Sequence, residues 1–126
     1  MAFNKNAKNA PISADNPTYP LFPVKELNCS ICGARKVSDK RILFTFRGEG
    51  FIVMNLALVS MQDGSTFIAS PTNMYTNKKG EKQYFKNAVL FFSRGDTEKI
   101  TEVVLDNYAD DPRNADFQTL HYIYDE

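Results

Sequence analysis

Apolar residues recur with a strict period of two in the middle of the chain, and this pattern predicts a β-strand there. Ile42, Phe44 and Phe46 alternate with mixed residues, so one face of the segment is apolar. A glycine-rich turn follows at residues 48–50, and residues 51–59 are apolar on both faces. A strand that is apolar on both faces suits a central position in a sheet. The pattern therefore predicts two antiparallel strands inside a larger sheet.

Turn signals divide the next part of the chain into shorter strands. A second turn lies at residues 62–64, and a short strand over 65–70 is closed by Pro71. Residues 77–80, Asn-Lys-Lys-Gly, form the tip of a long hairpin loop, and 84–92 return as the partner strand. This order predicts an antiparallel β-meander.

The apolar period changes to that of a helix after Ser93. Asp96 or Thr97 can cap the helix, and a helix is expected from about Thr97 to Tyr108. Apolar residues recur there at helical spacing: Ile100, Val103, Val104 and Tyr108. The predicted fold is therefore α+β, an antiparallel meander with one C-terminal helix packed on it.

The length of 126 residues fits one domain with additional ends. Residues 1–24 hold four of the six prolines and are expected to form an extended arm. The domain is expected over 25–109, and 110–126 form an acidic tail in which 120–124 can make a short strand. No apolar run approaches the roughly 18 residues of a membrane span, and no signal-peptide pattern is present. A cytoplasmic protein without a membrane partner is expected.

Two cysteines and one histidine are the soft metal-ligand candidates. Cys29 and Cys32 have the spacing of a zinc knuckle, with His121 the only other soft ligand. Two knuckles of a dimer could complete a four-cysteine site, but free thiols in the first strand are the preferred interpretation. No nucleophile with a base, phosphate-binding glycine loop or paired carboxylates is visible. Neither an enzyme, a metal nor a cofactor is expected.

Several local motifs occur in an order found in one family of small bacterial regulators. Residues 64–71, Gly-Ser-Thr-Phe-Ile-Ala-Ser-Pro, are followed by Gly80-Glu81 and by the segment Phe-Lys-Asn at 85–87. The helix at 99–108 reads Lys-Ile-Thr-Glu-Val-Val-Leu-Asp-Asn-Tyr. With these motifs, the chain over about 27–108 resembles the SpoVG family of septation and sporulation regulators, which bind nucleic acid.

The resemblance implies a fold, an assembly and a function. The implied fold is an antiparallel sheet with one C-terminal helix, assembled as a homodimer. The implied function is sequence-influenced binding of DNA or RNA through the long loop and the residues that open the helix. By position, the helix-opening segment runs from Arg94 to Lys99.

The net charge of zero hides two opposed parts of the chain. Residues 1–99 carry 14 Lys and Arg against 8 Asp and Glu, whereas residues 100–126 carry one Arg against 7 acids. Five basic residues interleaved with aromatic ones fall within 17 positions: Lys78, Lys79, Lys82, Lys86 and Arg94. Basic groups neutralise phosphates, and exposed aromatic rings stack on unpaired bases.

These features predict a nucleic-acid site on the hairpin and the start of the helix. Its members are Lys78, Lys79, Lys82, Lys86, Arg94, Lys99, Tyr75 and Tyr84. In the alternative interpretation the lysines only solubilise a hairpin tip and Phe85 belongs to the core. The acidic tail either competes with nucleic acid, binds a partner protein, or is a solvated end with one docked segment.

Two functions from different classes remain open at this point. The first is a SpoVG-like, homodimeric nucleic-acid-binding protein that acts in regulation or DNA transactions. The second is a structural or adaptor protein, bacterial or phage-encoded, that uses the same fold and its two ends to contact other proteins.

Overall fold

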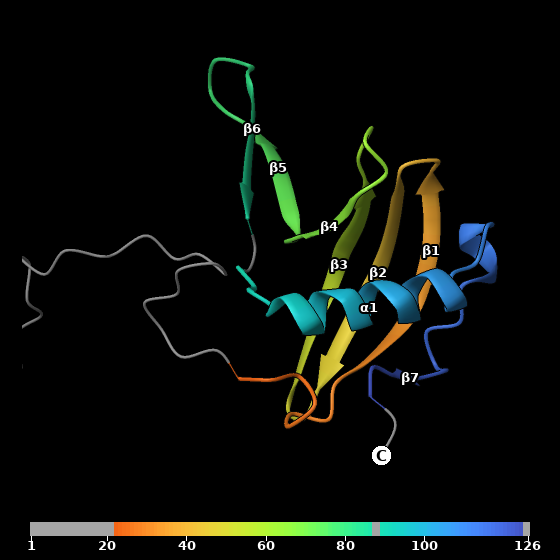
Figure 1. Cartoon of the computed structure of the whole chain (residues 1–126). Coiled ribbons are helices and arrows are strands. Elements are labelled where there is room, and N and C mark those ends of the chain that lie inside the picture. The colour runs from red at the N-terminus through yellow and green to blue at the C-terminus, as the bar shows by residue number, and fades with distance from the viewer. Residues whose placement is uncertain (1–21, 87–88, 125–126) are drawn as a thin grey trace, which may run out of the picture.

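An antiparallel sheet with one helix on its face forms the body of the protein (Figure 1). The computed structural model describes residues 22–86 and 89–124. The main sheet has five strands in the order β4-β3-β2-β1-β7. The strands are β1 (Ser30–Ser38), β2 (Arg41–Gly48), β3 (Phe51–Ser60), β4 (Thr66–Ala69) and β7 (His121–Tyr122). The α+β fold with an antiparallel sheet and one C-terminal helix is thereby confirmed.

The helix covers one face of this sheet and closes the core. α1 (Arg94–Asn107) places Ile100 and Val104 against the sheet, and both are fully buried. The strands contribute the alternating residues that the sequence pattern marks: Ile42, Phe44 and Phe46 are all buried in the same cluster. Burying these large side chains is the main force that holds helix and sheet together.

Three register shifts interrupt the regular pairing of the strands, and one of them, between β1 and β2, lies between Lys36 and Ser38. The pairing of β1 with β2 shifts between Cys32 and Arg35, where Gly33 has a φ of +61°. The pairing of β2 with β3 shifts between Phe44 and Phe46, opposite a segment in which Asn55 has a φ of +63°. Such bulges bend a strand and change its local twist.

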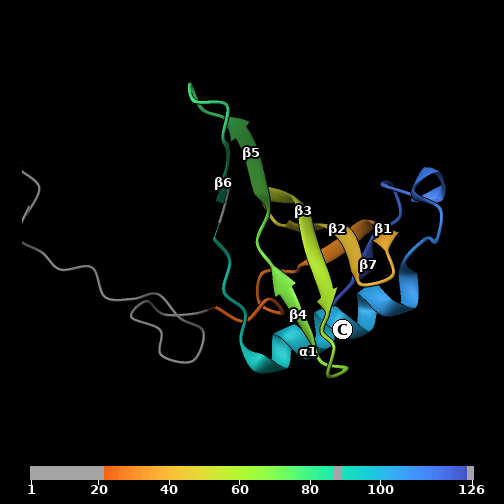
Figure 2. The same cartoon turned by 90° about the horizontal axis from the view of Figure 1, so that it is seen from above.

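The long hairpin is a separate two-stranded sheet. β5 (Thr72–Thr76) pairs with β6 (Lys82–Lys86) and with no other described strand. Figure 2 shows α1 on one side of the main sheet and this hairpin rising on the other side. The hairpin around the tip at 77–80 is confirmed, but it does not continue the meander of the main sheet.

The predicted return strand over 84–92 is wrong in its second half. β6 ends at Lys86, and residues 89–92 are irregular. Leu90 and Phe92 pack against the core, and the Phe92 ring meets the Phe46 ring edge-on at 5.3 Å. Their apolar character therefore reflects burial of a connecting segment rather than a strand.

The helix also begins earlier than predicted. α1 starts at Arg94 because Ser93 is its N-cap, and the Ser93 hydroxyl accepts a hydrogen bond of 3.1 Å from the backbone N–H of Asp96. Asp96 and Thr97, the predicted caps, lie inside the first turns. The helix ends at Asn107, one residue before the predicted end.

The C-terminal segment returns to the sheet as predicted for 120–124. After a short 3-10 turn, η1 (Pro112–Asn114), β7 pairs with the start of β1. Ile123 is buried in the core cluster, and Ala109 hydrogen-bonds with Ala34 and Lys36 at the edge of β1. This part of the acidic segment is therefore joined to the sheet and the core.

Most of the predicted N-terminal arm, 1–24, lies outside the described residues. Of the part that the structure describes, Val24 is buried in the core cluster and Phe22 is exposed. No helix within the described ranges is long and apolar enough to cross a membrane.

Candidate nucleic-acid interface

The register of the hairpin divides the predicted site residues between its two faces. In an antiparallel pair, directly opposite residues point to the same face, and neighbours along a strand alternate. Tyr84 is opposite Met74, and Lys86 and Lys82 are opposite Thr72 and Thr76. Lys82, Tyr84 and Lys86 therefore share one face of the hairpin with Met74. We call these four residues the basic-aromatic face.

Solvent reaches the basic-aromatic face along its whole length. The Tyr84 side chain is 70% exposed and Met74 is 49% exposed, and both lysines are exposed. Lys82 and Lys86 flank Tyr84 at a spacing of two residues, so the aromatic ring lies between two cations. This arrangement offers one stacking surface and two phosphate contacts along a single strand. Met74 is the one member of this face that was not among the predicted site residues. Alternation along residues 72–76 would have placed it on the same face as its neighbours at 72 and 76.

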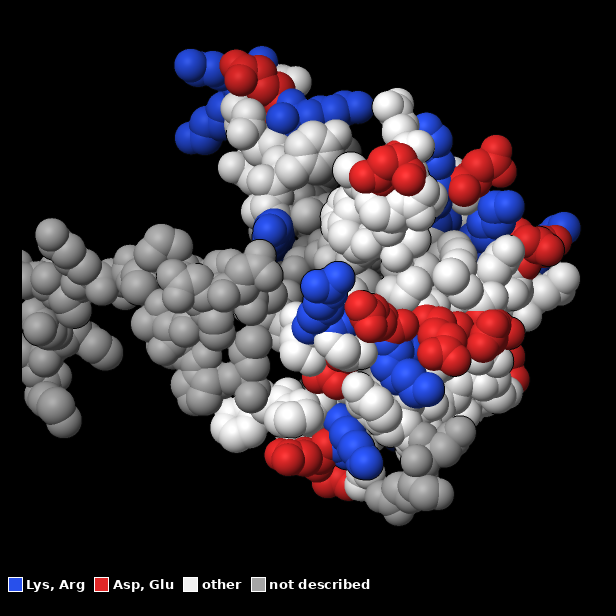
Figure 3. Space-filling model, viewed as in Figure 1, with Lys and Arg blue, Asp and Glu red and all other residues white. Residues whose placement is uncertain are grey.

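The tip of the hairpin is a preorganised turn that carries two further lysines. The Asn77 side-chain Oδ1 accepts hydrogen bonds from the backbone N–H groups of Lys79 at 3.0 Å and Glu81 at 2.9 Å. Gly80 supplies a φ of +80° that other residues rarely adopt. Lys78 and Lys79 are held at this turn, and both are exposed. In Figure 3 the lysines gather on the hairpin, whereas acidic groups gather along the helix.

The opposite face of the hairpin is aromatic and uncharged. Tyr75 and Phe85 are diagonal neighbours there, with ring centroids 5.9 Å apart. Phe85 is 47% exposed, so the alternative that Phe85 belongs to the core is wrong. Tyr75, one of the predicted site residues, is thus separated from the basic-aromatic face by the hairpin backbone.

The two predicted site residues on the helix are each paired with an acid. Arg94 Nε lies 3.5 Å from Glu98 Oε1, and Lys99 Nζ lies 3.7 Å from Glu102 Oε2. The positive charge of both is therefore partly balanced on the helix itself. The helix start still borders the hairpin base, because Lys86 and Thr97 line a common hollow of about 560 Å³.

The first turn of the helix is occupied by bonds within the protein. Asp96 is 5% exposed, and its Oδ2 accepts a hydrogen bond of 3.2 Å from the backbone N–H of Val24. Its Oδ1 accepts one of 2.6 Å from the Tyr124 hydroxyl. A buried carboxylate at a helix N-terminus is stabilised by the helix dipole. The Asp96 carboxylate thus connects the helix start with the segment at Val24 and with the segment at Tyr124.

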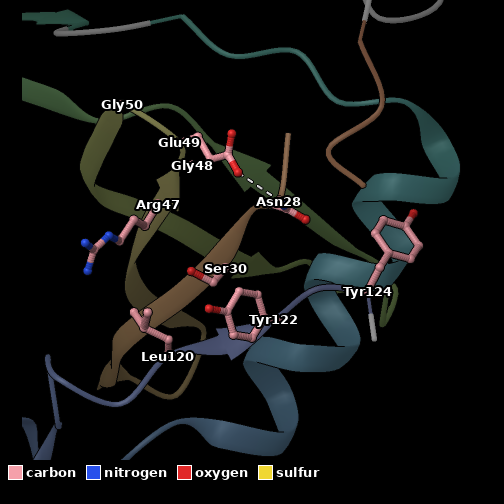
Figure 4. Close-up of a pocket in the computed structure, with 9 residues that line it drawn as sticks. All are labelled: Asn28, Ser30, Arg47, Gly48, Glu49, Gly50, Leu120, Tyr122 and Tyr124. Carbon is pink, nitrogen blue, oxygen red and sulfur yellow. Dashed lines mark hydrogen bonds between the residues drawn. The ribbon is translucent and has the colours of Figure 1, made fainter. Parts of the chain in front are cut away.

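A second concave surface at the other end of the sheet escaped the sequence analysis. A hollow of about 600 Å³ lies between the start of β1, the β2–β3 turn and β7 (Figure 4). Its walls come from segments far apart in the sequence, including Ser30, Arg47 and Tyr122. No motif spans these positions, so a sequence pattern could not have revealed the site.

The thiols have the environment of buried structural cysteines. Both cysteines are free and buried, and Cys32 lies in the first strand as predicted, whereas Cys29 directly precedes it. Burial, reinforced by the negative charge of Asp96, raises the pKa of Cys29 to about 11. Burial also raises the pKa of Cys32, although the positive charge of Arg47 opposes this shift. Burial therefore favours the neutral thiol form of both cysteines.

A single copy of the chain brings no cluster of three or more metal-ligand side chains together in its described residues. No group of three or more His, Cys, Asp or Glu side chains within 22–86 and 89–124 could hold a metal. His121 lies in β7, where it is directly opposite Ile31 of β1.

No family model, no curated protein and no solved structure matches this chain.

Proposed function

We propose that the protein binds DNA or RNA through the hairpin, as a SpoVG-like homodimer in the cytoplasm that acts in regulation or DNA transactions. The observation that carries the proposal is the shared exposed face of Lys82, Tyr84 and Lys86 on β6. An aromatic ring between two cations matches the alternation of base and phosphate along a strand. Lys78 and Lys79 extend the positive surface to the tip.

The shape of the hairpin supports this function. An isolated two-stranded hairpin is at best marginally stable in water, and its exposed apolar groups favour a bound partner. The two cations and the ring of the basic-aromatic face suit single strands, whose bases are free to stack. Duplex DNA, whose bases are already stacked, is the matched comparison.

The acidic groups modulate the proposed interface by charge. Glu98 and Glu102 partly neutralise Arg94 and Lys99 on the helix. Competition by the C-terminal acids requires a test by charge substitution, since deletion of the segment would also remove the buried Ile123. Asp110→Asn should tighten binding if this acid of the tail competes, and unchanged affinity would exclude that role for Asp110.

A polarisation titration with single-stranded and duplex oligonucleotides at two salt concentrations tests the proposal. The triple variant Lys78→Ala, Lys79→Ala, Lys82→Ala should bind at least tenfold more weakly and show a smaller salt dependence. The matched control removes three lysines elsewhere: Lys25→Ala, Lys36→Ala, Lys40→Ala. Equal weakening in both variants would indicate a net-charge effect and contradict the hairpin site. Undiminished binding of the first variant would exclude it.

One observation favours the second candidate function, that of an adaptor. The face with Tyr75 and Phe85 is exposed, aromatic and uncharged, which is typical of protein contacts. A protein partner on that face would leave the lysines free. If Tyr75→Ala abolishes capture of a partner protein while the lysine triple variant does not, the adaptor function is supported.

A further inference from the structure

The hollow beside β7 lies on the sheet face that α1 leaves open. Arg47 follows the core residue Phe46 along β2, so its side chain points to the face opposite α1. Ser30 is directly opposite both Arg47 on β2 and Tyr122 on β7. The three side chains therefore form one row across three adjacent strands, with a span of about 10 Å from β7 to β2.

Figure 4 shows this row facing a common space. The Arg47 side chain bounds the hollow on one side, and Leu120 and Tyr122 bound it on another. Ser30 lies between them as the floor. The hollow measures about 600 Å³, which is in the range of a small-molecule site.

The polar groups of the row have unused donors. Ser30 is only 2% exposed as a residue, and no hydrogen bond of its hydroxyl is found within 22–86 and 89–124. Since no buried side-chain oxygen or nitrogen in that part of the chain lacks a partner, the hydroxyl must reach the hollow that Ser30 lines. In the same part of the chain, the Arg47 guanidinium has neither an ion pair nor a hydrogen bond, and the Tyr122 hydroxyl has no hydrogen bond. A hydroxyl that opens into the hollow beside an unpaired guanidinium suits an oxyanion, above all a phosphate, which takes several donors at once.

An aromatic surface adjoins these donors. The Tyr122 side chain is 55% exposed and lies next to Leu120 at the wall of the hollow. Its ring can take a planar group, while Arg47 and Ser30 hold a phosphate on the neighbouring strands. The row thus presents a donor cluster and a stacking surface at a fixed separation.

One acidic group bounds the same hollow and must be included. Glu49 lies in the β2–β3 turn, and its Oε1 accepts a hydrogen bond of 3.0 Å from Asn28 Nδ2. This bond orients the carboxylate but leaves its negative charge at the rim. Glu49 therefore weakens the binding of any anion, and its removal should tighten it.

The geometry points to a nucleotide-binding site in this hollow, for a phosphomonoester attached to a planar base. Arg47 and Ser30 bind the phosphate, and the Tyr122 ring contacts the base. The same chemistry is carried by a free nucleoside monophosphate and by the 5′-phosphorylated end of a strand. The site is distinct from the hairpin and does not depend on the function proposed for it.

Calorimetric titration of the full chain with AMP, adenosine and inorganic phosphate tests the site. AMP should bind at least tenfold more tightly than either adenosine or phosphate, because only AMP engages both halves of the row. Arg47→Gln should weaken AMP binding at least tenfold, and Tyr122→Ala should weaken it several-fold while Tyr122→Phe retains it. Glu49→Gln should tighten it. All three substituted residues are exposed, so circular dichroism should show unchanged folding.

Oligonucleotides with and without a 5′-phosphate separate the two sources of ligand. If the 5′-phosphate increases oligonucleotide affinity and Arg47→Gln abolishes this increase, the ligand of the hollow is the phosphorylated end of a strand. If AMP binds but the 5′-phosphate gives no increase, the ligand is the free nucleotide. The control variant Lys78→Ala, Lys79→Ala, Lys82→Ala should leave AMP affinity unchanged. If this variant binds oligonucleotides more weakly but AMP as tightly as before, the lysines act at the hairpin and not in this hollow. Absence of AMP binding at millimolar concentration, or unchanged AMP affinity in Arg47→Gln, would overturn the assignment.

Discussion

The Tyr124 hydroxyl donates a hydrogen bond of 2.6 Å to Oδ1 of Asp96, and this bond joins the C-terminal segment to the first turn of the helix. The other carboxylate oxygen of Asp96 accepts the backbone N–H of Val24. One buried carboxylate thus connects the first described residues, the helix and the last ones. Charge-assisted hydrogen bonds of this kind are stronger than neutral ones.

The Tyr124–Asp96 bond should make stability depend on alkaline pH. The hydrogen bond to Asp96, with burial and the negative charge of Asp96, raises the pKa of Tyr124 to about 12 from an ordinary value near 10. Since the folded-state pKa is the higher one, the contribution is complete below pH 10 and disappears as pH rises from about 10 to 12. Chemical denaturation at a series of pH values should show this fall in the free energy of unfolding.

Tyr124→Phe isolates the effect from other groups that titrate in the same range. The variant should be less stable at neutral pH by about 1 kcal/mol and should show a smaller fall above pH 10. Tyr122→Phe is the matched control, because the Tyr122 hydroxyl has no hydrogen bond within the described part of the chain. The same alkaline profile for Tyr124→Phe and the wild type would contradict the role of this bond.

Ile123 should be a stability determinant although it lies in a segment that its composition marks as an acidic tail. It is 1% exposed and packs in the core cluster with residues of β1 and α1. Ile123→Ala should reduce the free energy of unfolding by about 2–4 kcal/mol, because it removes buried methyl groups and leaves a cavity. Leu105→Ala, at an exposed position of α1, should cost much less. Thermal denaturation of both variants makes the comparison, and equal destabilisation would show that the segment does not pack as described.

Gly33 should tolerate no side chain because two constraints meet there. Its φ is +61°, and a Cβ at this position would approach the Phe117 ring to 2.3 Å. Gly33→Ala should therefore displace the segment that carries Phe117 and destabilise the protein by more than the roughly 1–2 kcal/mol of left-handed backbone strain. Gly80 has a φ of +80° but no atom near the position of a Cβ, so Gly80→Ala measures the strain alone. If urea unfolding shows equal destabilisation of the two variants, the close approach to Phe117 does not contribute to the loss of stability.

The sequence predicted those parts of the fold in which local period and burial agree. The alternation of Ile42, Phe44 and Phe46 identified the core face because β2 lies between two long strands over the helix. Leu90 and Phe92 were misassigned to a strand because an apolar connection buried beside a helix start has the same composition as a strand. The sequence did not identify Ser93 as the N-cap, because Asp96 is an equally good cap by residue type. Only the folded structure shows that Ser93 caps the helix and that the Asp96 side chain is bonded elsewhere.

The candidate sites differ in how far the sequence reveals them. The hairpin lysines are close together in the chain, so their clustering could be predicted, whereas the side of the hairpin on which each ring lies required the register of β5 and β6. The row of Ser30, Arg47 and Tyr122 exists only because β7 pairs with β1. The sequence indicates a short strand over 120–124 but not the strand with which it pairs, so this row could not have been predicted.

The two tyrosines of the hairpin provide the sharpest test of how it meets nucleic acid. Tyr84 lies between Lys82 and Lys86 on the basic-aromatic face, whereas Tyr75 packs against Phe85 on the opposite face. Tyr84→Ala should weaken single-strand binding by about 1–3 kcal/mol, the range for removal of one stacked base. Because no charge is removed, the salt dependence of binding should stay the same.

Tyr75→Ala is the matched control, since it removes an aromatic ring of the same size from the same hairpin. It should leave the affinity within about twofold of the wild type, because a free-energy change below about 0.5 kcal/mol is typical of a ring outside the interface. Lys82→Ala with Lys86→Ala should reduce the salt slope by roughly 0.7 for each phosphate that the hairpin no longer neutralises. Equal weakening by Tyr75→Ala and Tyr84→Ala would mean that nucleic acid wraps both faces of the hairpin. In that case the division of faces by register does not define the interface.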